Sequence, residues 1–412
     1  MHPSLQTPPV KRLVSLDAYR GFIMLMLAAN GFGIAAMVSV SEDALIWKTL
    51  DRDVWTQLGW YFEHPPWISQ FSRFGVSPWD LIQPAFMFMV GVAMPFSFAR
   101  RSQAGHTDFE RHFHAFIRAV VLVLLGVFLQ SKSSDETNWT FVNVLSQIGL
   151  GYFFVYLMLP FRWYWQIAAI AFILVAYGLF FNVYEVPANY DFEAVAATSE
   201  TIFDGRWEPW SKNANIGHQV DLRLLNAFPR ENEFLYNGGG YVTLNFVPSM
   251  GTMLLGVLCG QILLSSASSW RKLATLLLIA GVTYALGIAM GETWIPIVKR
   301  IWTPSWTLFS GGYVVAMLAL FFVLFDMLPF QRLAFPLVVI GVNSLLMYMM
   351  GQLMRGWTTQ QFETHFGGLL ERMLPGAFDP EMWRPLVAPS VAMIVFWLIA
   401  YWLYRQRIFL RV

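Results

Sequence analysis

Residues 241–264 read YVTLNFVPSMGTMLLGVLCGQILL and contain no Asp, Glu, Lys, Arg or His. An apolar α-helix needs about 20 residues to cross the roughly 30 Å hydrocarbon core of a bilayer, so this stretch is long enough to span one. Over the whole chain of 412 residues, 56% are apolar and 13% are charged, about half the charged fraction of an ordinary soluble domain. The chain is therefore predicted to be an integral membrane protein and not a soluble enzyme.

Nine further windows share the length and the low central charge of this stretch. Together the ten predicted spans cover residues 19–41, 79–99, 114–130, 139–160, 163–184, 241–264, 272–291, 306–327, 336–355 and 387–405. The prediction is an all-α, polytopic membrane helix bundle of about ten transmembrane helices, which forms a single domain over residues 1–412.

The composition also excludes several classes of function. The 27 Lys and Arg residues nearly balance the 26 Asp and Glu residues, so the basic patch that nucleic-acid binding requires is missing. The single cysteine, Cys259, rules out an intramolecular disulfide and a thiolate metal cluster, and the seven His residues form no pair at metal-ligand spacing. We therefore expect a lipid bilayer as partner, no nucleic acid and no metal.

The distribution of charge predicts the orientation of the bundle. An even number of spans puts both termini on one side, and cytoplasmic termini place 14 of the 27 Lys and Arg residues but only four acidic residues inside, as the positive-inside rule requires. Three long polar segments, at about 42–78, 185–240 and 356–386, then lie outside. The second of them combines Trp with Asn and Asp, including Trp210 and Asn237, which suits a carbohydrate; an aromatic belt at the membrane interface explains the same residues.

Polar side chains within or beside the predicted spans are few, and each is costly unless it is paired. Asn30 lies near the middle of the first span, where its amide either binds a ligand or joins helices. His64, in YFEHPPW, is able to take and return a proton near neutral pH. Asp80, at the start of the second span, either orients such a group or caps the helix. Asn343 and Ser344 add neutral hydrogen-bonding groups to the ninth span.

Several longer stretches carry a family resemblance. The opening RLVSLDAYRGFIMLMLAANGFG is followed by HPPW and WDLIQPAFMFMVG, and further along by IRAVVLVLLGVFL, VLSQIGLGYFFVYL, IPIVKRIWTPSWTLFSGGY and GVNSLLMYMMGQ. In this order the blocks resemble the catalytic domain of the heparan-alpha-glucosaminide N-acetyltransferase family, including its bacterial relatives. They cover most of the predicted ten-span core.

The resemblance implies transfer of an acetyl group from cytoplasmic acetyl-CoA to an amino sugar across the membrane. It places the catalytic His of the family on His64, which would remove a proton from the acceptor, and the catalytic Asn on Asn30, which would donate to the developing oxyanion. Asp80 would orient or polarise its neighbour. Arg20 and Arg118, at cytoplasmic span ends within family-like blocks, are the candidates for binding the phosphates of acetyl-CoA.

The remaining candidate residues come from these blocks or, for Trp210 and Asn237, from the composition of residues 185–240. Asn343 and Ser344 are expected near acetyl-CoA, whereas Trp67, Trp210 and Asn237 are expected near the acceptor. Lys299 and Arg300 lie outside in the predicted topology, where they would meet an anionic acceptor or stabilise the fold. The bacterial relatives favour the bacterial inner (cytoplasmic) membrane as the location.

The chain departs from the family at two places. A longer segment separates His64 from Asp80, and SQIG at residues 146–149 stands where relatives often have a Gln-Arg pair, which removes a cation. Two other functions stay open: an amino-sugar permease without CoA chemistry, and a non-catalytic membrane scaffold. The acceptor, the acyl length, direct transfer against an acetyl-His intermediate, and assembly as a homo-oligomer are also left open by the sequence.

Overall fold

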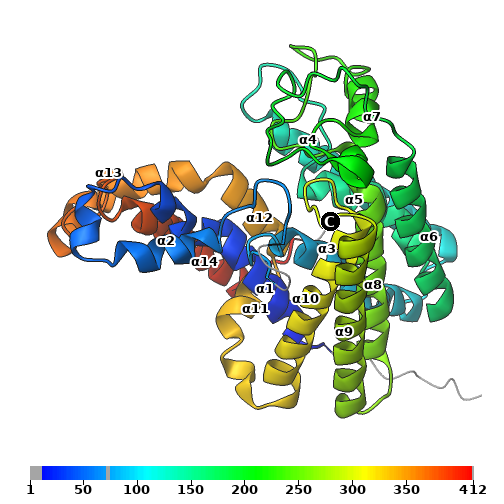
Figure 1. Ribbon diagram of the computed structural model, residues 1–412. Coiled ribbons are helices and arrows are strands. Elements are labelled where there is room, and N and C mark those ends of the chain that lie inside the picture. The colour runs from blue at the N-terminus through cyan, green and yellow to red at the C-terminus, as the bar shows by residue number, and fades with distance from the viewer. Residues whose placement is uncertain (1–11, 71–74, 411–412) are drawn as a thin grey trace, which may run out of the picture.

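The computed structural model describes residues 12–70 and 75–410; their regular secondary structure is all helical, without a strand, and loops connect the helices (Figure 1). The α-helices are α1 (Val14–Ala28), α2 (Arg52–Trp60), α3 (Ile82–Gln103), α4 (Asp108–Ser131), α5 (Val144–Leu157), α6 (Trp163–Asn182), α7 (Ile216–Leu225), α8 (Phe246–Leu264), α9 (Ser269–Thr293), α10 (Pro304–Phe322), α11 (Phe335–Gly341), α12 (Ser344–Leu353), α13 (Arg355–Met373) and α14 (Arg384–Arg405).

Among the described residues, seven helical segments are long and apolar enough to cross a membrane, and the number rises to nine if each of two bent helix pairs forms one span. The seven contain α3, α4, α6, α8, α9, α10 and α14. Helix α5 is apolar but shorter than the predicted span 139–160. It begins late because the Asn143 side chain accepts a hydrogen bond from the Ser146 amide and so caps the helix there.

The predicted spans 19–41 and 336–355 are not continuous helices. The first bends by 47° beyond α1, where Asn30 and Gly31 adopt φ values of 48° and 60°. This left-handed conformation cannot continue a right-handed α-helix. The second bends by 79° between α11 and α12, immediately before Ser344. Hydropathy does not detect either break, because the residues on both sides of it are apolar.

Helices α1 and α11 cross at almost direct backbone contact. A Cβ atom on Gly21 would lie 1.8 Å from the Leu337 carbonyl oxygen, and one on Gly341 would lie 1.9 Å from the Asp17 carbonyl oxygen. Only glycine permits this approach, as is common where helices pack within a membrane. The crossing holds the break before Ser344 against the first turns of α1.

Helices α1 and α3 run antiparallel between two polar ends of the molecule. The start of α1 and the end of α3 line one cavity, which contains Arg20 and Arg100. At their other ends, Gly31 lies so close to Trp79 that an added Cβ would be 3.4 Å from the indole ring. The two helices therefore connect the cavity with the region around Asp80.

The three predicted outer segments contain helices of their own. Residues 42–78 include α2, residues 185–240 include α7, and α13 occupies much of residues 356–386. Helices α2, α13 and α14 gather on one side of the molecule, away from α4 to α9 (Figure 1). A small core, in which Met37 and Ile46 pack with Trp383, joins them.

Candidate active site

Three side chains that are distant in sequence meet beside the start of α3. The Nδ1 atom of His64 lies 2.5 Å from Oδ1 of Asp80, and Nζ of Lys299 lies 3.0 Å from the same oxygen and 3.2 Å from His64 Nδ1. Asp80 and Lys299 are buried, with 1% and 4% of their surface exposed. The His64 side chain keeps 36% of its surface exposed. The cluster therefore has a buried ion pair with an accessible imidazole in front of it.

Loop contacts explain why the histidine reaches the aspartate. The Ser77 hydroxyl lies 2.7 Å from the Tyr61 carbonyl oxygen and 2.9 Å from the Glu63 carbonyl oxygen. Its oxygen also accepts a hydrogen bond from the Trp79 amide at 3.2 Å. One serine thus fastens the segment before His64 to the turn that contains Asp80.

A second set of contacts brings in Lys299. The Lys299 amide donates to the Ser69 hydroxyl oxygen and the Ser69 amide donates to the Ile297 carbonyl, both at 2.9 Å. These bonds hold the segment that follows HPPW against the connection between α9 and α10. The lysine side chain is thereby directed toward Asp80 from an element more than two hundred residues away.

The electrostatics of the cluster favour an ionised carboxylate and a neutral imidazole. Burial alone would raise the pKa of Asp80, but the Lys299 charge and the hydrogen bond from His64 outweigh it and hold that pKa below its usual value. Burial lowers the pKa of His64; the hydrogen bond to Asp80 opposes this and Lys299 adds to it. With Nδ1–H donating to Asp80, the lone pair lies on Nε2, which is the arrangement of a general base oriented by a carboxylate.

Arg300 ties another loop to this cluster. Its guanidinium donates to the Gly239 carbonyl at 2.9 Å and to the Pro65 carbonyl at 3.3 Å. The Asn237 side-chain oxygen accepts from the Gly239 and Tyr241 amides and shapes the NGGGY loop. Arg300 and Asn237 therefore position the residues around His64 through backbone contacts.

Trp67 and Trp210 lie in a buried apolar core and not on a surface. They are 1% and 0% exposed, and Trp67 Nε1 donates to the Trp210 carbonyl at 3.0 Å. The Trp210 ring stacks on Phe181 with centroids 4.8 Å apart. Neither indole offers a free face on which a sugar could stack, so in this structure the two support the loops and do not contact an acceptor.

Asn30 lies at the break after α1, at the same end of the molecule as His64. Its neighbour Gly31 is packed so closely that an added Cβ would lie 3.0 Å from the Phe62 ring. Asn30 is exposed, and among the described residues no hydrogen bond joins its amide to His64 or Asp80. The structure therefore brings Asn30 to the region of the cluster without direct contact.

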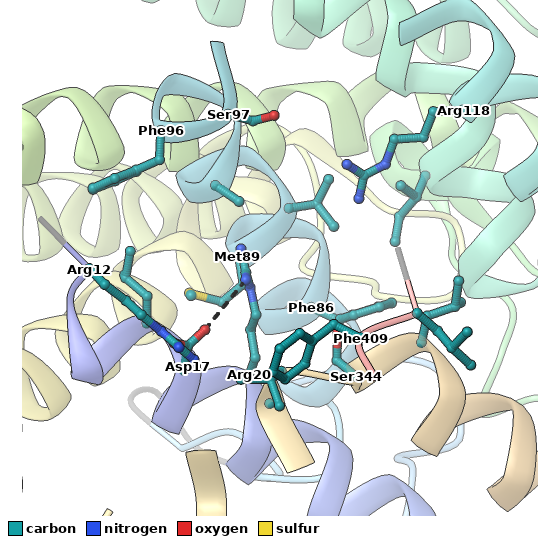
Figure 2. A pocket seen from close by; sticks show the side chains of 18 of the residues that line it. Arg12, Asp17, Arg20, Phe86, Met89, Phe96, Ser97, Arg118, Ser344 and Phe409 are labelled. Carbon is teal, nitrogen blue, oxygen red and sulfur yellow. Dashed lines mark hydrogen bonds and ion pairs between the residues drawn. The ribbon is translucent and has the colours of Figure 1, made fainter. Parts of the chain in front are cut away.

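A basic cavity of about 480 Å³ meets the start of α1 and runs along α3 from Phe86 to Arg101, with arginines at the ends of α1 and α3 that are far from Asp80. Its volume is within the range of roughly 300–1,000 Å³ typical of small-molecule sites. Arg20 and Arg118 enter it from different helices (Figure 2). Among the described residues that line it, Asp17 is the only acidic one, and the arginines are Arg12, Arg20, Arg100, Arg101 and Arg118. Asp17 pairs with Arg12 at 2.6 Å and more loosely with Arg20 at 3.9 Å. The surplus of positive charge suits a phosphorylated ligand.

Arg118 has unused hydrogen-bonding capacity in this cavity. Its Nε atom is buried without a hydrogen-bond partner in the described part of the chain, and its guanidinium carbon lies 4.9 Å from the centroid of the Tyr152 ring. Buried donors are nearly always satisfied in native proteins. The phosphates of acetyl-CoA would supply the missing acceptor, so the residues present fit this cosubstrate.

Ser344 and Asn343, the other two residues predicted near acetyl-CoA, differ in what they contact. Ser344 lines the cavity. Asn343 instead binds the C-terminal tail: its amide donates to the Ile408 carbonyl at 3.1 Å and its oxygen accepts from the Leu410 amide at 2.9 Å. Since Phe409 and Leu410 line the cavity, Asn343 contributes by holding its wall.

The cavity and the cluster are separate features of this structure. The residues that line the cavity do not include His64, Asn30 or Asp80. On α3, the cavity is bordered by Phe86, which stacks on Tyr348 of α12 with ring centroids 6.3 Å apart. The lining that the structure describes therefore does not extend from the cavity to the cluster.

Ser77 and three arginines of the basic cavity were not singled out as site residues by the sequence. Lys299 was expected to meet an anionic acceptor or to stabilise the fold, and the structure places its side chain against Asp80. Arg12, Arg100 and Arg101 were used only to predict orientation, although their shared cytoplasmic placement already indicated that they gather. The IPIVKRIWTPSW block was the signal for Lys299, but its partner could not be read from it.

No family model matches the chain, and no curated protein is similar to it. The family resemblance of the sequence blocks therefore stays an expectation. The structural class rests on the helices themselves: an all-helical protein with seven to nine candidate membrane helices in its described residues.

Replacing Asp80 with asparagine should destabilise the protein by about 3–5 kcal/mol, because Lys299 would keep a buried charge without its partner. Thermal unfolding in detergent would measure the loss. The double variant D80N/K299M should recover most of it, since both charges are then gone. Asp53→Asn, at an exposed position of α2, serves as the matched control. If the D80N protein were as stable as the D53N protein, Asp80 and Lys299 would not form a buried ion pair.

Proposed function

We propose that the protein is a membrane-bound acyltransferase that moves an acetyl group from cytoplasmic acetyl-CoA to a carbohydrate acceptor, an amino sugar, on the outer side of the membrane. One observation carries this proposal: an arginine-lined cavity and a carboxylate-oriented imidazole lie at opposite ends of the same two helices, α1 and α3. A reaction with a charged donor on one side and a polar acceptor on the other needs these two sites.

The proposed topology is ten spans with both termini in the cytoplasm of a bacterial cell and the protein in its inner membrane. The two bent helix pairs and the short α5 would complete the set of ten. The five arginines of the basic cavity all belong to the predicted cytoplasmic side, whereas His64 and Lys299 belong to the predicted outer side. Their separation in the structure supports this orientation.

The chemistry uses the cluster as follows. The acceptor amine or hydroxyl attacks the thioester carbonyl carbon while Nε2 of His64 takes its proton. The carbonyl electron pair moves to oxygen, and the Asn30 amide donates to that oxyanion. When the carbonyl re-forms, the carbon–sulfur bond breaks and the CoA sulfur takes the proton from His64. Asp80 keeps the imidazole in the required tautomer and stabilises its protonated form.

The donor has to reach the cluster between α1, α3 and α12. Phe86 and Tyr348 stack at the border of the basic cavity, so displacement of this aromatic pair would open the way for the flexible arm of acetyl-CoA. Lid-like motions of this kind are common steps in catalysis.

A second cavity supports an acceptor on the outer side. It has a volume of about 520 Å³ and its lining is mostly polar, with Asn138, Thr140, Arg230, Asn232, Tyr236 and Asn237 among its residues. Asn237 also shapes the loop that Arg300 ties to the segment of His64. Amide and hydroxyl groups beside an aromatic ring suit the hydroxyls and faces of a sugar.

Purified protein in liposomes tests the proposal directly. With acetyl-CoA on the side of the basic cavity and glucosamine on the other, free CoA and N-acetylglucosamine should appear together in equal amounts. Labelled sugar that crosses the membrane without CoA release would instead establish the permease. Release of CoA that does not depend on the sugar would show thioester hydrolysis and contradict the acceptor assignment.

The rate of transfer should fall as pH is lowered through the pKa of His64; an acceptor amine, which titrates at about pH 8, adds a separate inflection that a hydroxyl acceptor lacks. The inflection from His64 should lie below 6.5, the ordinary pKa of histidine, because burial lowers the pKa of His64 and the neutral imidazole is the active form. A pH profile of kcat in the liposome assay measures this. A profile whose lowest inflection lies above 6.5 would contradict the base assignment.

A further inference from the structure

Three buried side-chain oxygens have no hydrogen-bond partner in the described structure: Gln147 Oε1 on α5, Asp221 Oδ1 on α7 and Asn245 Oδ1 at the start of α8. Their residues are 0%, 1% and 2% exposed. Buried polar atoms are rarely left without a partner in native proteins. All three are acceptors, so the occupant they lack is a group with positive charge or with donors.

Gln147 and Asp221 both bond the backbone of one turn, the 3₁₀ helix Thr243–Asn245, and Asn245 is the last residue of that turn. The Thr243 amide donates to Asp221 Oδ2 at 2.9 Å, and the Thr243 carbonyl accepts from Gln147 Nε2 at 3.1 Å. Asn245 closes the same turn, and the Thr243 side chain is itself buried. The oxygens without a partner thus belong to residues that share this one turn.

Asp221 lacks a compensating charge. In the described residues no Lys, Arg or His forms an ion pair with it. Asp221 is 1% exposed, and the hydrogen bond that its carboxylate accepts among the described residues comes from the Thr243 amide. A buried carboxylate without a charged partner is costly.

We propose that Asp221, Gln147, Thr243 and Asn245 form a binding site for one monovalent metal cation. Hard cations prefer oxygen ligands, and a single carboxylate balances a single positive charge while the amide and hydroxyl oxygens complete the shell. A divalent ion would leave an excess of buried positive charge. The proposal is independent of the acyltransferase function.

The position of the site connects it with the candidate active site. The Asn245 side-chain amide donates to the Arg300 carbonyl at 2.8 Å, and Arg300 follows Lys299 in the chain. A bound cation would hold α5, α7 and the start of α8 together next to the segment that contains Lys299.

Thermal unfolding of the detergent-purified protein tests the site without any turnover assay. At constant ionic strength and pH 7.5, NaCl or KCl should raise the Tm of the wild type saturably relative to choline chloride, because a ligand that binds only the folded state stabilises it. Asp221→Asn should abolish the difference between the salts. Asp204→Asn, at an exposed position, should keep it, and Asn245→Ala should raise the half-saturating cation concentration at least tenfold.

Equal Tm values in the three salts at pH 7.5 would overturn the proposal, as would a D221N protein that keeps the cation-specific shift.

Discussion

Acetyl transfer should fall by about 10²–10⁴-fold when His64 is replaced by alanine, which is the usual contribution of a positioned general base. The fold should survive, because the His64 side chain is 36% exposed and its removal leaves the Asp80–Lys299 pair intact. Binding of acetyl-CoA should also persist, since His64 does not line the basic cavity. The measurement is CoA release in liposomes, together with Tm and acetyl-CoA affinity of the purified variant.

His365→Ala is the matched control, because His365 lies exposed on α13 away from both sites. It should retain the wild-type rate. Asn30→Ala tests the oxyanion assignment and should lower the rate by about 10²–10³-fold. CoA release at the wild-type rate by the His64 variant would remove the cluster from the mechanism, even if the transferase activity itself were established.

Loss of the Arg118 guanidinium should raise the KM for acetyl-CoA by roughly 10–100-fold, since a hydrogen bond to a charged group contributes about 1.5–3 kcal/mol. The effect on kcat should be smaller, because Arg118 lies on α4 in the basic cavity and not beside His64. Arg118→Lys should recover part of the affinity by keeping the charge without the planar fork. Initial rates at varied acetyl-CoA concentration separate the two constants.

Arg162→Ala provides the control for general charge, because Arg162 is exposed before α6 and does not line the basic cavity. Dephospho-CoA derivatives sharpen the result. If Arg118 binds the 3'-phosphate, the acetylated derivative without that phosphate should bind the wild type and the Arg118→Ala variant equally well. An unchanged KM for acetyl-CoA in the variant would show that Arg118 only anchors the helix beside Tyr152.

Much of the helical architecture was predictable because membrane helices are specified by length and apolar composition. The breaks at Asn30 and before Ser344 were not, because each depends on the φ values of a few residues inside an apolar stretch. AANGFG and GVNS were the visible signs, yet Gly and Asn also occur where membrane helices pack tightly without a break. Likewise, residues 356–386 were predicted as a loop from their polarity, although polarity does not distinguish a loop from α13.

The candidate site was predictable residue by residue but not as an arrangement. His64, Asp80 and Lys299 lie on three segments, and only tertiary contacts such as those of Ser77 and Ser69 bring them together. Trp67 and Trp210 illustrate the opposite outcome: a composition that suits sugar binding also suits a buried aromatic core, and the sequence pattern is the same for both.

The hydrogen bonds of Asn343 to Ile408 and Leu410 matter for the design of truncated and tagged proteins. Residues 406–410 follow α14, and Phe409 and Leu410 form part of the wall of the basic cavity. A protein truncated after Arg405 would therefore have a larger and more open basic cavity while its helices stay in place. A tag in an exposed turn on the far side of the molecule would leave this cavity undisturbed.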